Sequence, residues 1–457
     1  MTAKLNRQVF KTSRLLEFCS QKELILQTGH PVEQWPCVIV KELADNGLDN
    51  CEEAGIAPVI EVIVRHNTIT VADNGSGIKP ATVRSLLDFS SRVSSREAYA
   101  SPTRGAQGNA LKTLVAMPFA LDGTSGETVI EAGGIRHQIK FMVDGIRQVP
   151  TIEHSEDHSD VRNGTSVTIK WPISACSILD EAKSRFLQIA DDYTWLNPHL
   201  ALHLEWDGEE RKIEPTDPTW HKWLPSDPTS VYWYDQERLE RLAAAYVAND
   251  QDHNRSRTVR EFISEFCGLS GTAKQKAVLE ETGMARTALA DLFIDDKANR
   301  EAIIALLNAM KGATRAVRPA DLGVIGKDHI TKRFEVAGAN LETFNYKRML
   351  RDDDGIPAVI EIAFGYCPEE MRERRIITGV NWSVGVNDPF RQLGQYGQSL
   401  DTYLQEQRVG RYEPIILLVH LACPRIAYTD RGKSAVALRG KVTESETNDD
   451  DMPEGAE

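Results

Sequence analysis

Apolar side chains recur between residues 32 and 54 with the spacing of an α-helix, which commits one face of this segment to a core. Four residues share that face: Val40, Ala44, Leu48 and Cys51. Gly55 stands where such a helix would stop. The opposite edge carries Glu42, Asn46 and Asp49 at positions i, i+4 and i+7, so we expect three oxygen-bearing side chains to line it.

A hairpin and a glycine-rich turn are predicted directly after this helix. Two runs of β-forming residues, 59–64 and 68–72, are separated by three residues. The second run ends in Asp73-Asn-Gly-Ser-Gly77. Two glycines let the backbone of such a turn approach a ligand closely.

A second glycine turn follows a segment that is small, polar and partly basic, residues 90–104. It reads Gly105-Ala-Gln-Gly108, and residues 109–121 can form a helix. The simple interpretation is a mobile loop that feeds a glycine-flanked helix start. Two more strand-like stretches lie near 138–143 and 165–171, and Gly164-Thr165 opens the second.

The rest of the chain is divided by a proline-rich segment. Four prolines mark a linker or domain edge: Pro215, Pro218, Pro225 and Pro228. Residues 255–312 are rich in helix formers, with breaks at 268–271 and 281–283, which predicts a small helical domain. Strand-like stretches then return: 358–364, 376–381 and 415–421.

Charge and cysteine content narrow the class of protein. Lys and Arg number 53 against 67 Asp and Glu, a net charge of −14 that does not favour a surface-wide nucleic-acid binder. The stretch 444–457 is acidic without a basic residue, so we expect it to be disordered. The seven cysteines form no C-x-x-C pair, which argues against a disulfide framework or a cysteine zinc site and favours a reducing cytosol. No stretch has the roughly 18 apolar residues of a membrane span, and residues 1–14 lead into no signal core.

Hydrolysis of a nucleoside triphosphate needs a carboxylate that activates water, an oxygen ligand for magnesium and backbone N–H groups around the phosphates. Glu42 can supply the base, and Asn46, one helical turn later, can ligate Mg²⁺. Asp73 can accept a hydrogen bond from an adenine amino group beside the two glycines of its turn. The 105–108 turn precedes a helix start, where N–H groups and the helix dipole favour an anion.

Each of these motifs alone is also typical of ordinary structure. An acidic helix edge is usually a solvated face, and D-x-G-x-G is commonly a plain turn. The chain has no G-x-x-x-x-G-K-[ST] sequence, so an ATP site here needs another fold. The order of helix, hairpin, loop and glycine turn supplies one.

Four motifs resemble, in order and spacing, the nucleotide-binding motifs of the gyrase, chaperone, histidine-kinase and MutL ATPase superfamily. They are Glu42-Leu-Ala-Asp-Asn46, Asp73-Asn-Gly-Ser-Gly77, Arg104-Gly-Ala-Gln-Gly108 and Gly164-Thr165. Within that superfamily, residues 41–55 (KELADNGLDNCEEAG) are most similar to the B subunit of DNA topoisomerase VI. The similarity continues in stretches that resemble its helix-two-turn-helix insert and transducer domain: 258–283, 318–330, 357–365 and 415–437.

The resemblance implies an α+β fold built on a Bergerat-type ATPase sandwich. The implied domains are an ATPase domain with an N-terminal strap (1–230), a helix-two-turn-helix-like domain (231–325), a transducer-like domain (326–441) and an acidic disordered tail (442–457).

The resemblance also implies roles for particular residues. Glu42 becomes the general base and Asn46 the Mg²⁺ ligand. The residues expected at the adenine are Asp73, Gly75, Gly77 and Thr165. The residues expected at the phosphates run from Gly105 to Leu111 and include Gly108, Asn109 and Ala110, and Arg104 is also expected to bind the nucleotide. Lys433 either reaches the γ-phosphate as a second catalytic residue or is an ordinary surface lysine beside the acidic tail.

Three features depart from the family pattern. Ala110 stands where the family has a third glycine, so the phosphate contacts can differ in detail. Gly47 lies within the first helix where serine is usual, at a cost of about 1 kcal/mol of helix propensity relative to alanine. Only 24 residues follow Lys433, where topoisomerase VI has a long helix that grips its A subunit.

The function implied is that of an ATP-binding and ATP-hydrolysing subunit that dimerises on ATP, gates or clamps double-stranded DNA and drives a separate, topoisomerase A-like cleaving subunit. The alternative is a stand-alone ATP-gated DNA clamp in repair or defence, without topoisomerase activity. A degenerate binding module is disfavoured because the main site residues are present, and a sensor histidine kinase fits poorly because only His30 precedes Glu42. We expect a cytoplasmic protein, nucleoid-associated if the organism is prokaryotic.

Two local clusters are candidates for DNA contact despite the acidic total. They are Lys4, Arg7, Lys11 and Arg14 near the N-terminus, and Arg255, Arg257 and Arg260 at the start of the helical segment. A cluster of this kind can equally be an ordinary solvated face.

Overall fold

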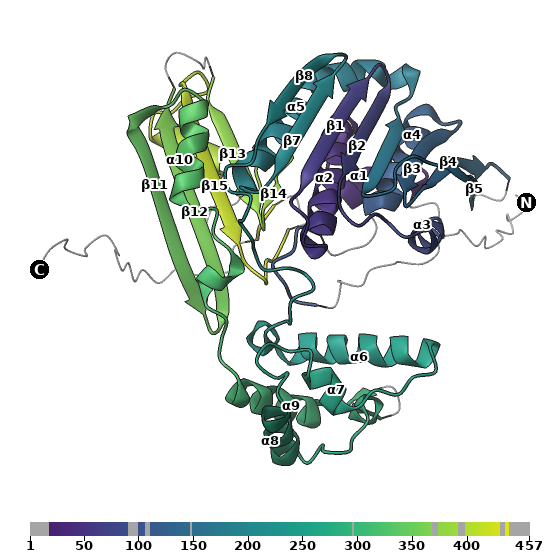
Figure 1. The fold of residues 1–457 in the computed structure, drawn as a ribbon, viewed down its shortest axis with the longest axis vertical. Helices are drawn as coiled ribbons and strands as arrows, with labels where there is room; N and C mark the ends of the chain where they lie inside the picture. Colours follow the sequence, from purple (N-terminus) through teal and green to yellow (C-terminus); the bar gives the residue numbers. More distant parts are fainter. Residues whose placement is uncertain are drawn as a thin grey trace, which may run out of the picture.

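The computed structural model describes residues 18–89, 99–105, 110–146, 149–294, 297–367, 373–391, 398–429 and 435–437. Its elements form an eight-stranded sheet with helices on it, a five-stranded sheet beside it, and a helical unit below both in Figure 1. One continuous cluster of buried side chains runs through all three groups. The α+β class predicted from the sequence is confirmed.

The larger sheet has the strand order β5-β4-β3-β6-β2-β1-β7-β8. Its strands are β1 (Val59–Arg65), β2 (Thr68–Asp73), β3 (Gly126–Ala132), β4 (Ile135–Asp144), β5 (Val149–His158), β6 (Thr165–Lys170), β7 (Ala201–Trp206) and β8 (Glu209–Ile213). Neighbouring strands are antiparallel except β1 and β7, which pair in parallel. The hairpin predicted after the first helix is confirmed as β1 and β2, with Arg65 opposite Thr68.

Helices cover one face of this sheet. They are α1 (Gln21–Thr28), the short helix η2 (Val32–Gln34), α2 (Trp35–Glu53), α3 (Pro80–Leu86), α4 (Ala110–Asp122), η3 (Ile173–Ala175) and α5 (Cys176–Leu196). The apolar face predicted for the first helix is buried, since Val40, Leu48 and Cys51 have no exposed surface. A Cβ atom at Gly47 would lie 2.8 Å from Ile60 Cδ1 and 3.0 Å from Asp73 Cβ. Close packing of α2 on β1 and β2 therefore accounts for a glycine inside this helix.

The helical unit consists of η4 (Val231–Trp233), α6 (Gln236–Asp252), α7 (Val259–Ile263), α8 (Thr272–Thr282), η5 (Leu289–Leu292), the two-residue strands β9 (Phe293–Ile294) and β10 (Lys297–Ala298), and α9 (Arg300–Ala313). Both predicted breaks are confirmed. Gly271 is the N-cap of α8, and Gly283 ends it in the left-handed conformation. Thr258 begins α7 with a capping box to Glu261.

The smaller sheet has the order β11-β12-β15-β13-β14. Its strands are β11 (Asn340–Asp353), β12 (Ile356–Tyr366), β13 (Arg375–Val380), β14 (Ser383–Val384) and β15 (Ile415–Ala422), and the helices of this part are η6 (Pro319–Leu322), α10 (Lys327–Val336) and α11 (Leu400–Glu406). Three predicted strands are confirmed as β12, β13 and β15. Sequence reasoning missed β11, a largely exposed edge strand whose polar composition lacks the apolar alternation of a buried strand. Figure 1 shows α10 lying across β11 and β12.

The proline-rich segment packs into the junction of the three groups rather than running free as a linker. Trp220 Nε1 donates to the carbonyl of Val324 at 2.6 Å, and the amide of Trp223 donates to Leu322 at 2.8 Å. The rings of Trp220 and Trp382 lie 6.0 Å apart in edge contact. Apolar aromatic burial therefore fixes this segment, although its prolines suggested a boundary.

None of the helices in the described ranges is long and apolar enough to span a bilayer. All seven cysteines fall in those ranges, and each is a free thiol. The expected acidic tail, 442–457, lies outside the described residues, as do the four basic residues expected at the N-terminus.

Candidate nucleotide site

Helix α2 presents a row of polar side chains toward the end of strand β2. Glu42 is 26% exposed, Asn46 is exposed and Asn50 is partly buried, at positions i, i+4 and i+8 of the helix. The prediction that Asp49 lies on this edge is wrong. Asp49 is 7% exposed and faces the interior, where it pairs with Arg104. The repeat of four between Glu42, Asn46 and Asn50 is the signal that could have identified the correct edge.

Asp73 lies at the end of β2 with its carboxylate held in a fixed orientation. Its Oδ1 accepts hydrogen bonds from the Gly75 amide at 2.8 Å and from Asn50 Nδ2 at 3.0 Å. Burial raises the pKa of Asp73, while hydrogen bonds from Gly75, Asn50 and Thr165 oppose that rise. The side chain is thus an oriented acceptor, which is what recognition of an exocyclic amino group requires.

The turn after Asp73 is closely packed against the start of β6. Gly77 has φ 79°, and a Cβ there would lie 2.8 Å from the carbonyl oxygen of Gly164. Gly164 has φ 73°, and a Cβ there would lie 1.8 Å from the Asp73 carbonyl oxygen. The Thr165 hydroxyl accepts a hydrogen bond from the Ile78 amide at 3.1 Å. Glycine is required at both positions, and these contacts bring Asp73, Gly75, Gly77 and Thr165 together as the sequence analysis expected.

The expected phosphate-binding residues are only partly within the described residues. Gly108 and Asn109 lie outside them, while Gly105 comes just before that gap and Ala110 and Leu111 begin α4 after it. The Leu111 side chain is buried, so this residue can offer only its backbone N–H to a phosphate. Next to it, Lys112 donates from Nζ to the Asp88 carbonyl at 2.5 Å. Burial lowers the pKa of this lysine.

Arg104 is predicted to bind the nucleotide, and the structure places its side chain among buried carboxylates. The guanidinium is fully buried and donates to Asp49 at 2.7 Å and to both carboxylate oxygens of Glu52 at 2.6 and 2.7 Å. Lys222 and His199 also contact Glu52, each at 3.0 Å. Two buried carboxylates attract this arginine more strongly than an open edge can, and its side chain is committed to them.

The row on α2 is connected to the smaller sheet through a second ionic cluster. Lys41 Nζ contacts Glu42 at 2.8 Å and Asp45 at 3.0 Å. The carboxylate of Asp45 also accepts from the Tyr193 hydroxyl of α5 and from Ser383 Oγ of β14, both at 2.7 Å. Burial opposes the charge of Lys41, but Asp45 and Glu42 outweigh it and raise the lysine pKa well above its usual value. Sequence reasoning missed these residues because the contact spans 338 positions.

The turn that carries Ser383 into this cluster has an unusual backbone. Asn381 and Trp382 both have positive φ, 51° and 62°, although neither is glycine. The turn is held by the Asn197 side chain, which donates to the Trp382 carbonyl at 3.0 Å, and by Asn381 Oδ1, which accepts from the Cys423 amide at 2.8 Å. The surrounding contacts therefore fix the β13–β14 turn against α2 and α5.

Lys433 lies outside the described residues, but residues on either side of it are placed. Tyr428 pairs with Val436 as a β-bridge, and the Thr429 amide donates to Ala435 at 2.9 Å. Burial raises the pKa of Tyr428, and the nearby charges of Lys41 and Asp45 also act on it. Tyr428, a few residues before Lys433, therefore lies within electrostatic range of Lys41 and Asp45.

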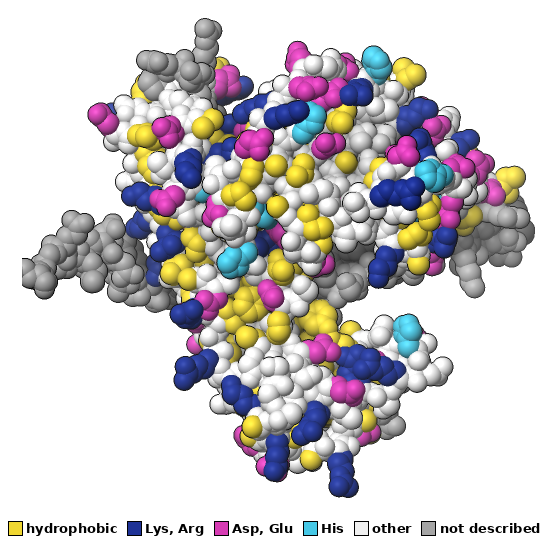
Figure 2. Space-filling model, viewed as in Figure 1, with side chains coloured by type: hydrophobic (Ala, Val, Ile, Leu, Met, Phe, Trp, Pro, Cys, Tyr) yellow, Lys and Arg dark blue, Asp and Glu magenta, His cyan; other side chains and the backbone are white. Residues whose placement is uncertain are grey.

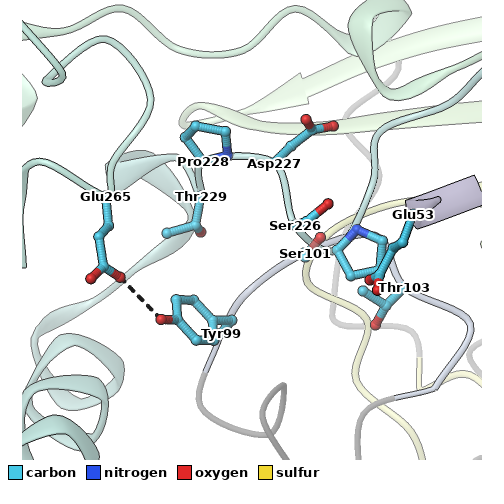
Figure 3. Close-up of a pocket in the computed structure, with 10 residues that line it drawn as sticks. Glu53, Tyr99, Ser101, Thr103, Ser226, Asp227, Pro228, Thr229 and Glu265 are labelled. Atoms are coloured by element: carbon cyan, nitrogen blue, oxygen red, sulfur yellow. Dashed lines mark hydrogen bonds between the residues drawn. The ribbon is translucent and has the colours of Figure 1, made fainter. Parts of the chain in front are cut away.

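A separate polar cavity of about 440 Å³ opens at the carboxyl end of α2. Figure 3 shows Glu53 from that helix facing Ser101 and Thr103, with residues 226–229 above them and Glu265 of the helical unit opposite. The Tyr99 hydroxyl donates to Glu265 at 3.1 Å. This cavity lies between the larger sheet and the helical unit, at the opposite end of α2 from Glu42.

Comparison with known families agrees with this geometry. Residues 32–175, which contain α2, the Asp73 turn, the 105–108 turn and Thr165, match the histidine kinase-, DNA gyrase B- and HSP90-like ATPase family. This part of the chain is similar to that ATPase family.

Three relatives extend the similarity beyond the ATPase region, and each is the B subunit of a type 2 DNA topoisomerase 6. The protein from Archaeoglobus fulgidus is 25% identical over 443 residues, covering 92% of this chain and 69% of that protein. The protein from Metallosphaera sedula is 23% identical and covers 87% of this chain and 75% of its own length. The protein from Methanosarcina barkeri is 27% identical and covers 87% and 64%.

Two solved structures align with this chain at lower identity. The N-terminal domain of a DNA repair protein aligns with a TM-score of 0.40 and 12% identity, covering 87% of each chain. The ATPase region of Saccharomyces cerevisiae topoisomerase II aligns with a TM-score of 0.39 and 11% identity, covering 89% of this chain and 77% of the other.

Proposed function

We propose that this chain hydrolyses ATP, with Glu42 as general base and Asn46 as the magnesium ligand. The observation that carries the proposal is that Glu42, Asn46 and Asn50 form one row on α2. The carboxylate of Glu42 is accessible to solvent at one end of the row, and Asn50 at the other end donates a hydrogen bond to Asp73. Asp73, Gly75, Gly77 and Thr165 hold the adenine end, and the start of α4 with Gly105 faces the phosphates. Magnesium supplies charge neutralisation on the phosphate oxygens when it is bound.

Lys41 positions the proposed base. Its ammonium lies 2.8 Å from Glu42 and 3.0 Å from Asp45, so this ion pair limits the rotamers of Glu42. A charged carboxylate next to the γ-phosphate can take a proton from the attacking water. Tyr193 and Ser383 hold Asp45, and through it they hold Lys41 in turn.

The same contacts can couple the position of the smaller sheet to the nucleotide that is bound. Ser383 of β14 bonds to the helix that carries the proposed base, and Tyr428, a few residues before Lys433, lies within electrostatic range of Lys41 and Asp45. We propose that Lys433 contacts only the terminal phosphate. Such a contact distinguishes ATP from ADP and biases the position of the smaller sheet.

The relatives' names extend the proposal to DNA. We infer that the chain acts as a B-type subunit that dimerises on ATP, gates double-stranded DNA and drives a separate DNA-cleaving subunit. The similarity over most of the chain to the B subunits of topoisomerase 6 supports this. A stand-alone clamp without a cleaving partner is the alternative.

The DNA-contact residues expected in the helical unit need one correction. Arg257 is 8% exposed and pairs with Asp250 and Glu265, so it is structural. Figure 2 shows other Lys and Arg side chains spread over the visible face of the helical unit. Several exposed ones are paired with carboxylates, including Arg241 with Glu237 and Lys276 with Glu280. If this unit binds DNA, its Lys and Arg side chains must leave these carboxylates and pair with DNA phosphates. The affinity for DNA then falls steeply as the salt concentration rises.

The decisive experiment is ATP hydrolysis by the purified chain with and without Mg²⁺ and double-stranded DNA, beside Glu42→Ala. The matched control is Glu61→Gln, a 49% exposed carboxylate on β1. Magnesium-dependent turnover that disappears in Glu42→Ala and persists in Glu61→Gln supports the site. Equal rates in wild type and Glu42→Ala contradict it.

Two further measurements separate the finer parts of the proposal. Lys433→Ala should weaken binding of a non-hydrolysable ATP analogue and leave ADP binding unchanged. Light scattering should show a dimer with the analogue and a monomer with ADP. DNA stimulation of turnover without strand passage in the presence of a cleaving subunit would favour the stand-alone clamp.

A further inference from the structure

The edge of the larger sheet carries a cluster of metal-ligating side chains far from the nucleotide residues. His137 on β4 lies directly opposite Glu156 on β5, and His154 lies two residues before Glu156 on the same strand. Because side chains two residues apart point to the same face of a strand, all three project from one face of the sheet. Their nearest nitrogen and oxygen atoms lie within 4.8 Å of one another.

The spacing of these atoms matches the bond lengths of a bound cation. His137 Nδ1 is 3.0 Å from His154 Nε2 and 3.5 Å from Glu156 Oε1, and His154 Nε2 is 3.9 Å from the same oxygen. Three atoms at these separations lie on a circle of radius about 2.0 Å, which equals a zinc–nitrogen or zinc–oxygen bond length in proteins. One point is therefore at bonding distance from all three ligand atoms, and a small adjustment of the side chains, which replaces the His137–His154 hydrogen bond, lets the ion sit out of their plane as tetrahedral coordination requires.

The surroundings hold the ligands in place. His137 is 1% exposed on the helix-covered face of β4, between buried Ile139 and the solvent edge. Arg84 of α3 donates from Nε to Glu156 Oε1 and from Nη2 to Oε2, both at 2.7 Å. A carboxylate oxygen has two lone pairs, so Oε1 can accept from Arg84 and still ligate a cation. Such outer contacts orient the ligands of natural zinc sites.

We propose that His137, His154 and Glu156 bind one Zn²⁺ ion per chain, with a solvent molecule in the fourth position. Two imidazoles and one carboxylate suit zinc in tetrahedral geometry. His154 is 19% exposed and Glu156 is 30% exposed, which leaves an entry path and an open ligand position. Arg84 removes part of the negative charge, so the affinity is below that of a four-ligand structural site.

The bound ion would add side-chain bonds among three elements, β4, β5 and α3, that already contact one another. It links the edge strand β5 to β4 directly and to α3 through Glu156 and Arg84. Helix α3 begins three residues after Gly77 of the nucleotide turn. The ion therefore stabilises the far edge of the sheet and the contact of that edge with α3, and the site stands independently of the proposed hydrolysis.

The test is a titration of the purified full-length chain, freed of metal by a chelator and studied without nucleotide. Zn²⁺ affinity is measured by competition with a chromophoric chelator, and Co²⁺ reports geometry through its visible absorption. We expect one Zn²⁺ per chain and the intense bands of tetrahedral cobalt. His154→Gln and Glu156→Gln should each lower the affinity by about 100-fold or more.

Two controls keep the outcome decisive. His158→Gln changes another histidine of β5 that is exposed and contacts Arg162, and it should bind zinc like the wild type. The seven free thiols are an alternative metal site, and ligation by thiolate gives cobalt an added near-ultraviolet band. Equal affinity in wild type and His154→Gln, or a thiolate band in the wild type, overturns the proposal. Zinc-dependent thermal stabilisation in wild type and His158→Gln, but not in His154→Gln, confirms it.

Discussion

Helix α2 carries two clusters of acidic side chains one or two turns apart, one partly open to solvent and the other buried. The open cluster has Glu42 and Asp45 around one cation, Lys41, and Glu42 remains 26% exposed. The closed cluster has Asp49 and Glu52 against Arg104 and Lys222, and all four side chains are 7% exposed or less. The first can act on a ligand, whereas the second can only hold the fold together.

The difference is set by what packs against each end of the helix. Near Glu42 the neighbours are Tyr193 and Ser383, which bond to Asp45 and leave the edge of the helix open. Near Glu52 the neighbours are His199 and Asn197, which close over the carboxylates and Arg104. Residues of the same type on one helix thus acquire different roles from their tertiary partners.

The largest expected effect separates the two clusters by function. Glu42→Gln should lower the rate of ATP hydrolysis by about 10²- to 10⁴-fold, because the amide cannot accept the proton of the attacking water. Its unfolding free energy should change by less than about 0.5 kcal/mol, since the side chain is partly solvated. Steady-state hydrolysis and urea unfolding measure both quantities.

Glu52→Gln is the matched comparison for that variant. It should destabilise the fold and leave the turnover of the folded fraction close to wild type. A large loss of turnover in folded Glu52→Gln would mean that the closed cluster takes part in catalysis, and the distinction between the clusters would fail.

The next effect is on stability alone. Arg104→Met should lower the unfolding free energy by about 3–5 kcal/mol, because it leaves Asp49 and Glu52 buried with less compensating charge. Arg241→Met removes an arginine that is 72% exposed and paired with Glu237, and it should cost less than about 1 kcal/mol. Chemical denaturation of the two variants tests the contrast. Similar losses of unfolding free energy in the two variants would show that Arg104 is not what compensates the charges of the buried Asp49 and Glu52.

The contributions of the two clusters to the free energy of unfolding should also change with pH in opposite directions. Burial would raise the pKa of Glu52, but Arg104 and Lys222 hold it well below its usual 4.5, so its stabilisation is present above about pH 4.5 and is lost as the pH falls. Burial lowers the pKa of His199, which adds to the loss of stability below about pH 6.5. Burial raises the pKa of Asp45 above 3.8, so its contribution is greatest in acid and is lost as the pH rises through the raised pKa.

This sign difference can be measured with two variants. Glu52→Gln should flatten the decline of the unfolding free energy as the pH falls below about 4.5, and Asp45→Asn should steepen the decline that precedes it as the pH falls toward 3.8. Each change is bounded by about 1.4 kcal/mol per pH unit for one proton. The measurement is urea unfolding at a series of pH values in constant ionic strength. Changes of the same sign in both variants would show that the clusters respond to acid alike.

Sequence periodicity predicted much of this molecule but could not separate the clusters. The apolar face of α2, the β1–β2 hairpin and the Asp73 turn are set by local patterns, and each was predicted. Asp49 and Arg104 were misplaced because their environment depends on Glu52, Asn197 and Lys222, which come from separate segments of the chain. The contact of Ser383 with Asp45 has no local signal, since it depends on how the smaller sheet docks on α2.

The smallest expected effect tests whether the open cluster communicates with the smaller sheet. Ser383→Ala removes one hydrogen bond of 2.7 Å to Asp45, which keeps its contacts with Lys41 and Tyr193, so the stability loss should be about 1–2 kcal/mol. If Ser383 also positions Lys41 and Glu42, kcat should fall several-fold while the KM for ATP stays constant, and Ser383→Thr should restore part of the rate. Ser264→Ala removes a hydroxyl that donates to a local carbonyl in the helical unit, and it should change neither parameter. If Ser383→Ala loses stability but keeps its kcat, the hydrogen bond from Ser383 to Asp45 only holds the two sheets together and does not affect catalysis.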